Sequence, residues 1–222
     1  MLLTILADGS KLPPLIIFKG KDRAKIWREL QKDQHVKNGD CIVECNENAW
    51  STLAIMRRWY SNIWKKYLDS VEFNTEGDGY LILDKATSHL NDEFINEFTT
   101  ENKIISFIPS GLTRYLQPLD VVVSRPFKNA LKEVYVNYCI EKGVELVKVA
   151  KITMIDWICK IWQNEKIITQ EMIYKSFRCT GIANYLNRTE DYFFTAWKHM
   201  QEEAPLIEDD IDENINEQEI FR

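Results

Sequence analysis

The segment of residues 80–135 restricts the fold more than any other part of the chain. It contains two apolar runs, residues 80–83 and 104–108; the first ends on Asp84, and the second leads to Asp120. Such continuous hydrophobicity is typical of strands in a parallel sheet that is covered on both faces. Because an open α/β sheet places its chemistry at the carboxyl ends of its strands, the two aspartates predict a shared metal site at a sheet edge.

The metal site predicted in this way is short of one ligand. Sites that combine carboxylates across a sheet edge usually use a third one, and the sequence before Asp84 offers no convincing candidate. Taken alone, Asp84 could also be a strand-end aspartate that caps a turn or the following helix. Its pairing with Asp120 favours the metal-site interpretation.

The remaining pattern predicts a mixed α/β sheet. The first three strands are expected as an antiparallel meander, with Pro13 and Pro14 at the entry to the second strand. Strand–helix–strand units follow, and the chain beyond residue 153 is expected to be helical. The predicted strands are residues 2–6, 15–18, 41–45, 80–83 and 104–108. The predicted helices are residues 49–69, 91–98, 125–149, an amphipathic segment that contains residues 157–162, 169–177 and 191–200.

Composition predicts a folded chain inside the cell. Its 222 residues suffice for one sizeable domain with an appendage, and a 45% hydrophobic content with 7 Trp supports a packed core. The tryptophans lie on predicted apolar helical stripes, Trp50 among them, which indicates core positions. No apolar run is long enough to span a bilayer, and no signal peptide is recognisable, so we expect a soluble intracellular protein without a membrane partner.

The five cysteines are odd in number and scattered, which predicts free and largely buried thiols in a reducing compartment. Cys41, Cys45 and His35 could form half of a zinc site. No matching second pair follows, so ordinary cysteines on a strand are the favoured interpretation.

Negative charge is concentrated at the end of the chain. Residues 201–222 hold nine acidic residues and one basic residue, which leaves 27 basic and 25 acidic residues in residues 1–200. The acidic tail is predicted to be solvated and disordered. Residues 1–200 are nearly neutral in net charge, so their charge does not exclude a nucleic-acid partner.

Three motifs together resemble a known family. Leu83-Asp84-x-x-x-Ser88-His89 is followed by Gln117-Pro118-Leu119-Asp120 and by Arg125-Pro126-Phe127-Lys128, and residues 7–20 resemble the family's first hairpin. This combination resembles the DDE endonuclease domain of pogo/Tigger-type transposases, within the Tc1/mariner superfamily. The resemblance extends over roughly residues 2–197.

The resemblance implies an RNase H-like fold flanked by helices, with a C-terminal helical extension. It implies a DNA substrate, a nuclear location, and phosphodiester chemistry with two Mg²⁺ or Mn²⁺ ions. Asp84 and Asp120 match the second and third catalytic carboxylates, and His89 matches a residue near the site. Lys85, Arg125 and Lys128 could hold phosphates, although solvated helix faces are the competing interpretation.

The chain departs from the family where the first carboxylate is expected. That residue belongs to a strand upstream of the opening hairpin, so residues 1–145 are predicted to form a core without its first strand. Residues 146–200 would be the C-terminal helical part, and residues 201–222 the tail. We expect impaired cleavage, and the neighbours of the absent strand are expected to be unpaired and prone to association.

A domesticated, non-enzymatic module that binds DNA, chromatin or protein is the alternative function. A homo-oligomer or a chromatin partner is left open.

Overall fold

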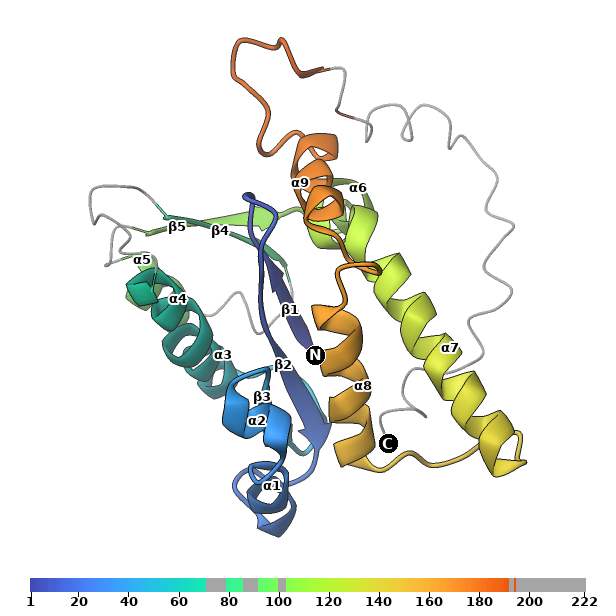
Figure 1. Cartoon of the computed structure of the whole chain (residues 1–222). Helices are drawn as coiled ribbons and strands as arrows, with labels where there is room; N and C mark the ends of the chain where they lie inside the picture. The colour runs from blue at the N-terminus through green and yellow to red at the C-terminus, as the bar shows by residue number, and fades with distance from the viewer. Residues whose placement is uncertain (71–78, 86–91, 100–102, 192–193, 195–222) are drawn as a thin grey trace.

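The computed structural model describes residues 1–70, 79–85, 92–99, 103–191 and 194, and these form two small sheets with helices around them (Figure 1). The first sheet has the order β1 (Leu2–Ile5), β2 (Lys11–Lys19), β3 (Ile42–Asn46); the second pairs β4 (Gly79–Asp84) with β5 (Lys103–Ile108). The helices are α1 (Lys25–Leu30), α2 (Gln34–Asn38), α3 (Leu53–Trp59), α4 (Lys65–Ser70), α5 (Asp92–Thr99), α6 (Thr113–Leu116), α7 (Ser124–Lys142), α8 (Lys151–Gln163) and α9 (Gln170–Cys179), with π-helical η1 (Tyr60–Trp64) and η2 (Leu119–Val123).

The opening hairpin is confirmed, but its prolines lie inside the second strand. β1 and β2 pair antiparallel, and the register shifts between the Leu2–Leu15 and Thr4–Leu12 pairs. β3 pairs with β2 from Leu15 onward. The prolines at 13 and 14 therefore sit at an irregularity, where the missing proline N–H groups remove no regular ladder bond.

β3 pairs parallel to β2, so the predicted antiparallel meander is wrong at this step. Helices α1 and α2 lie in the connection between the two strands and turn the chain back. A parallel pair requires a long crossover of this kind, whereas a hairpin turn gives an antiparallel pair. The parallel pairing of β4 and β5 agrees with the continuous hydrophobicity of their sequences.

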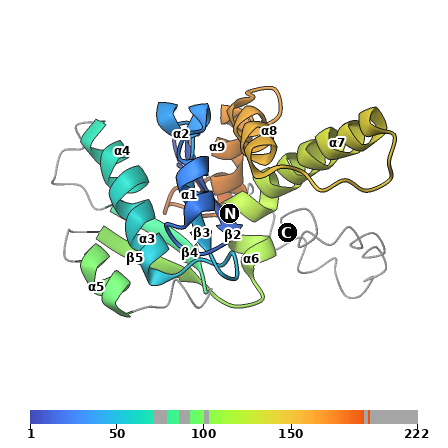
Figure 2. The same cartoon turned by 90° about the horizontal axis from the view of Figure 1, so that it is seen from below.

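Alternate side chains of β2 pack into two separate hydrophobic cores. Ile16 and Phe18 pack into a cluster with side chains of α7, α8 and α9. Leu15 and Ile17 pack into a second cluster with α3, β4 and α5. Because successive side chains of a strand point to opposite faces, the first sheet is covered by helices on both faces, as the two views show (Figures 1 and 2).

The long helix predicted from residue 49 begins later, and this corrects the expectation for Trp50. The Thr52 hydroxyl accepts a hydrogen bond from the Ile55 N–H at 3.4 Å and so caps α3 at Leu53. Trp50 precedes the cap and is 74% exposed, whereas Trp59 and Trp64 are buried as predicted.

The later helices lie close to their predicted positions, except that one of them is shorter than predicted. α7 ends at Lys142 rather than near residue 149, because Gly143 takes a left-handed conformation with φ 65°. α9 begins where a helix was predicted, after Thr169, whose hydroxyl accepts a hydrogen bond from the Met172 N–H at 3.0 Å and so caps the helix. Most of the helix predicted for residues 191–200, and the acidic tail, lie outside the described residues.

All five cysteines are free and buried, as predicted. Among the described residues, no three His, Cys, Asp or Glu side chains are grouped to hold a metal ion, so the half zinc site gains no support. Across the same residues, no helix is both long and apolar enough to cross a membrane.

His35 joins the layer of α2 to α8. Its Nδ1 lies 2.8 Å from Asp40 Oδ2, and its Nε2 lies 3.2 Å from Asp156 Oδ1. The hydrogen bond to Asp40, assisted by Asp156, raises the pKa of His35 above 6.5, although burial opposes the shift. Burial would raise the pKa of Asp156, but hydrogen bonds from Lys160 and His35 lower it. An imidazolium held between two carboxylates therefore connects the two elements.

We call the interaction of His35 with Asp40 and Asp156 the charged clamp. Because the folded-state pKa of His35 is raised, the clamp contributes its full stability below about pH 6.5, and this stability is lost as pH rises through the folded-state pKa. We expect His35→Gln to lower the free energy of unfolding by about 1–2 kcal/mol at pH 5.5 and by less at pH 8.5, measured by urea denaturation. Lys37→Gln, an exposed change on the same helix, should show no such difference. An equal loss at both pH values would contradict the charged clamp.

Candidate functional site

A large cavity lies between the two sheets and contains both predicted carboxylates. Its volume is about 1600 Å³, and its walls come from β1, β4, β5, the segment before α3, the α6–η2 segment and the end of α9. Asp84 and Asp120 are the carboxylates among the described residues that line it. The cavity therefore brings together two residues that are far apart in sequence, and their role as metal ligands stays a prediction.

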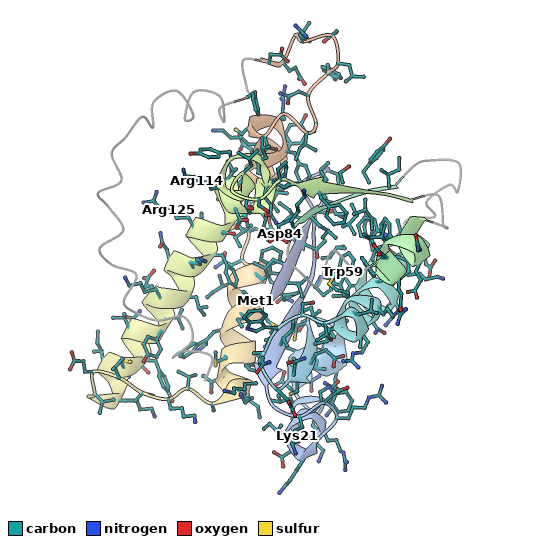
Figure 3. The ribbon with its side chains drawn as sticks, turned by 180° about the vertical axis from the view of Figure 1, so that it is seen from behind. Met1, Lys21, Trp59, Asp84, Arg114 and Arg125 are labelled. Carbon is teal, nitrogen blue, oxygen red and sulfur yellow. The ribbon has the colours of Figure 1, made fainter. Side chains whose placement is uncertain are left out.

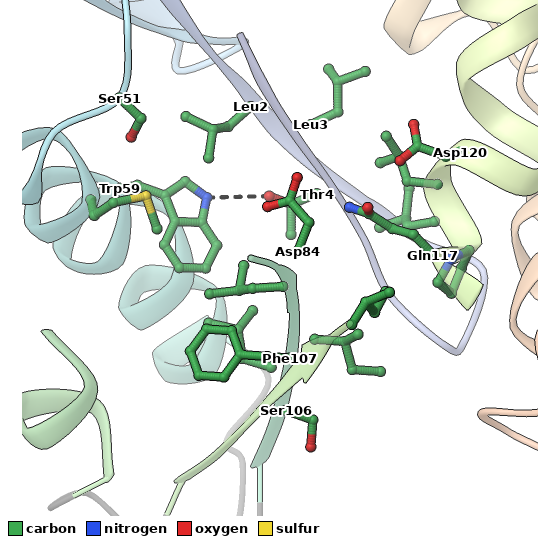
Figure 4. Close-up of a pocket in the computed structure, with 18 of the residues that line it drawn as sticks. Leu2, Leu3, Thr4, Ser51, Trp59, Asp84, Ser106, Phe107, Gln117 and Asp120 are labelled. Carbon is green, nitrogen blue, oxygen red and sulfur yellow. Dashed lines mark hydrogen bonds between the residues drawn. The ribbon is translucent and has the colours of Figure 1, made fainter. Parts of the chain in front are cut away.

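Asp84 is the last residue of β4 and is half-buried. The apolar residues before it are held by pairing with β5, which matches Leu83 with Phe107 and Asp84 with Ile108. Asp84 lines the cavity together with Thr4 of β1 and Trp59 (Figure 4). Sequence analysis therefore placed this residue correctly at a strand end.

Asp120 lies in a different secondary-structure element from the one predicted. It does not directly follow a strand: helix α6 separates it from β5, and it lies in the first turn of η2. Its Oδ1 accepts a hydrogen bond from the Ser124 hydroxyl at 2.9 Å, one turn along the helix. The side chain is exposed at the cavity wall, so it is held at one oxygen and accessible to solvent.

Gln117 is a further candidate to which sequence analysis gave no role. Its side chain lines the same cavity, and Figure 4 shows it extending from the wall that carries Asp120 towards Asp84. Its Oε1 is buried and has no hydrogen-bond partner among the described residues. An unsatisfied buried carbonyl oxygen is costly unless a ligand, an ion or water pairs with it. The signal was present in the Gln117-Pro118-Leu119-Asp120 motif itself.

The side chains at this site offer the kind of oxygen ligand that a hard divalent cation binds, but they offer too few of them. Carboxylate and amide oxygens are the ligands that Mg²⁺ and Mn²⁺ prefer. Asp84, Asp120 and Gln117 supply such atoms, but the described part of the chain contributes no third carboxylate to the cavity. These residues could thus hold a metal ion weakly, and a full set needs a ligand from elsewhere.

Positive charge lies near the two carboxylates. Lys85 directly follows Asp84 and is exposed, and Arg125 and Lys128 are exposed in the first turns of α7. Arg114, which sequence analysis missed, stacks its guanidinium 4.6 Å from the Tyr115 ring centroid. Figure 3 shows Arg114 and Arg125 on the same flank of the molecule. His89, predicted near the site, lies outside the described residues.

A comparison against known families identifies the family of this chain. Residues 1–177 match the DDE superfamily endonuclease family, and the chain belongs to it. It is similar to the human protein "Pogo transposable element with KRAB domain", with 27% identity over 198 residues, and to its mouse counterpart, with 26% identity over 212 residues. The human protein "Pogo transposable element with ZNF domain" is 30% identical over 132 residues. The predicted resemblance is confirmed.

These relatives are much longer proteins. The three matches cover 86%, 92% and 59% of this chain, but only 30%, 32% and 8% of the relatives' own lengths. The chain therefore corresponds to about a third of the first two proteins or less. No solved structure matches the chain.

A hydrogen bond between β1 and α3 maintains the cavity wall beside Asp84. The Trp59 Nε1–H donates to the Thr4 hydroxyl at 3.2 Å, and Trp59 is only 2% exposed. We expect Thr4→Val to destabilise the protein by about 1–3 kcal/mol in urea denaturation, because it leaves a buried indole N–H without a partner. With Trp59→Phe already present, the same change should cost much less. Additive effects in this double-mutant cycle would contradict a direct interaction.

Proposed function

We propose that this chain is a transposase-derived DDE endonuclease domain that binds DNA and holds a divalent metal ion between Asp84 and Asp120. The observation that carries the proposal is the presence of both carboxylates on the wall of one cavity, within a chain that matches the endonuclease family over residues 1–177. Asp84 and Asp120 would be direct ligands, with Gln117 as an additional oxygen donor.

Mg²⁺ or Mn²⁺ supplies the chemistry that such sites perform, which is charge stabilisation at the attacking and leaving oxygens of a phosphodiester. The residues of this chain contribute the binding and orientation of the ion. Asp84 is fixed by the β4–β5 pairing, and Ser124 orients Asp120. With two carboxylates in the described cavity wall, we expect weak metal binding and impaired cleavage.

We further propose an RNase H-like arrangement for residues 1–145, with residues 146–200 as a C-terminal helical part. Support comes from the two sheets facing one cavity and from helical cover on both faces of β2. The two core clusters are consistent with two halves of a larger sheet. The resemblance to a transposase further leads us to propose a nuclear location.

DNA would bind along the positively charged flank of the cavity. Lys85, Arg114, Arg125 and Lys128 present cations around the two carboxylates, and phosphate contacts of this kind position a duplex without reading its sequence. A negatively charged backbone would then meet the metal ion at Asp84 and Asp120. Because residues 1–200 are nearly neutral overall, DNA binding would depend on this local cluster of cations rather than on the net charge of the chain.

The second candidate is a non-enzymatic module that binds DNA, chromatin or another protein. The observation that favours it is the incomplete carboxylate set among the described residues of the cavity. Such a module would have the same fold but would not need a metal ion. Measurements of metal binding therefore distinguish it from the leading proposal.

We expect Mn²⁺ to bind the chain, and Asp84→Asn and Asp120→Asn each to weaken that binding by about tenfold or more, measured by electron paramagnetic resonance of free Mn²⁺. Asp69→Asn, on the exposed surface of α4, is the matched control. Any Mn²⁺-dependent nicking of supercoiled DNA should disappear in Asp120→Asn. Equal Mn²⁺ affinity in all four proteins would favour the non-enzymatic module.

Neutralising the cations of α7 should weaken DNA binding independently of metal. We expect Arg125→Ala and Lys128→Ala to lower the affinity for a duplex, with each removed phosphate contact reducing the slope of log K against log salt by about one. Fluorescence anisotropy in EDTA measures this directly. Lys166→Ala, an exposed change between α8 and α9, is a control for loss of charge alone. Unchanged slopes in both α7 variants would exclude this flank as the DNA-binding surface.

A further inference from the structure

Apolar side chains are exposed along the second half of α7. Val136 and Ile140 are four residues apart on this helix, and they are 41% and 71% exposed. Val144 and Leu146, just beyond the end of the helix, are 45% and 69% exposed. We call these four side chains the α7 patch. Figures 1 and 2 show α7 at the edge of the molecule, with α8 beside it. Grouped apolar side chains on a surface mark a site of interaction.

Positive charge continues the same face of α7 towards the start of the helix. Five exposed residues follow one another at intervals of three or four and so share a helix face: Arg125, Lys128, Lys132, Val136 and Ile140. This face is therefore basic in its first half and apolar in its second half. The exposed charges on and just after α7 are five cations and three carboxylates: Arg125, Lys128, Lys132, Lys142 and Lys148, with Glu133, Glu141 and Glu145. A matching occupant would be acidic and would carry an apolar stripe.

The sequence of residues 201–222 has both of these properties. It holds nine acidic residues and one basic residue. Ile207, Ile211 and Ile215 recur at intervals of four residues after Pro205, which is the pattern of one apolar face on a helix that begins after a proline. At helical spacing the intervening carboxylates lie on the other faces: Glu208, Asp209, Asp210, Asp212 and Glu213. A merely solvated acidic run needs no such stripe.

The covalent connection is long enough to bring this segment to α7. Phe194 packs against Gly181, close to the end of α9, and α9 in turn packs against η2, which runs directly into α7. The 11 residues from 195 to 205 span at most about 40 Å when extended. The 19 residues of α7 are about 28 Å long. The whole exposed face of α7 is therefore within reach of the segment in the same chain.

We propose that residues 206–219 dock on the α7 patch of the same chain as an acidic amphipathic helix. The three isoleucines cover the apolar half of the α7 face, and the carboxylates lie against its basic half. A helix of these 14 residues is about 21 Å long, which fits along α7. Docking covers Arg125 and Lys128 and so competes with a DNA backbone for the same cations. The docking itself is independent of DNA binding, whereas the competition rests on the proposed function.

The test of docking is photo-cross-linking of the full 222-residue chain with benzoylphenylalanine in place of Ile211, mapped by mass spectrometry. We expect cross-links to residues 132–146. The matched control carries the same group in place of Asp209, on the opposite face of the segment, and its yield should be about tenfold lower. An equal mixture of isotope-labelled and unlabelled chains distinguishes the source of the segment. Cross-linked peptides of a single isotope support docking within one chain.

Three results would overturn the docking. Equal yields from positions 211 and 209 would mean that no particular face of the segment binds. Cross-linked peptides of mixed isotope would assign the patch to a second copy of the chain. The absence of cross-links to residues 132–146 would show that this segment does not occupy the patch.

The competition is tested with Ile140→Asp, which places a carboxylate in the α7 patch. We expect this variant to lose the cross-links and to bind a DNA duplex about threefold more tightly or better, because α7 is then free in more of the molecules. Leu186→Asp, at a fully exposed position outside the patch, should change neither property. Both variants should keep the melting temperature of the parent chain. Loss of the cross-links with unchanged DNA affinity would overturn the competition. Cross-links in a chain that binds no DNA would support the docking and refute DNA binding alone.

Discussion

The burial of β2 on both of its faces is the constraint on which the rest of the structure depends. Its alternate side chains enter two different cores, with Ile16 and Phe18 on one side and Leu15 and Ile17 on the other. The helices of the C-terminal half must therefore pack on one face, and α3 and α5 on the other. Residues of both cores, among them Trp59 and Phe177, contribute to the walls of the cavity beside β1.

The candidate site follows from this arrangement. β4 and β5 contribute to the second core, and their pairing brings Asp84 to the cavity from one side. The α6–η2 segment leads into α7 of the first core and brings Gln117 and Asp120 to the same cavity. Two acidic side chains from different elements therefore line one cavity at the junction of the cores. A site built at a junction is sensitive to how the two halves are joined.

The sequence predicted most local structure because its signals are local. The apolar runs of β4 and β5 and the start of the helix at Thr169 each depend on a few neighbouring residues, and these elements occur where expected. The parallel pairing of β3 was missed because strand direction depends on the path of the crossover. Trp50 was misplaced because an apolar pattern runs across Thr52, and only the capping hydrogen bond shows where the helix begins. Asp84 was placed correctly at a strand end, whereas the shared role of Asp84 and Asp120 stays a prediction. The π-helical position of Asp120 and the unpaired oxygen of Gln117 depend on tertiary packing.

The central claim is that Asp84 and Asp120 serve one metal ion. The most direct measurement is the anomalous difference density of a crystal of this chain soaked in Mn²⁺, recorded at the manganese absorption edge. We predict a peak within about 2.0–2.3 Å of a carboxylate oxygen of each aspartate, with Gln117 Oε1 facing it. A peak bound to one aspartate alone, or no peak in the cavity at a saturating concentration of Mn²⁺, would contradict the account.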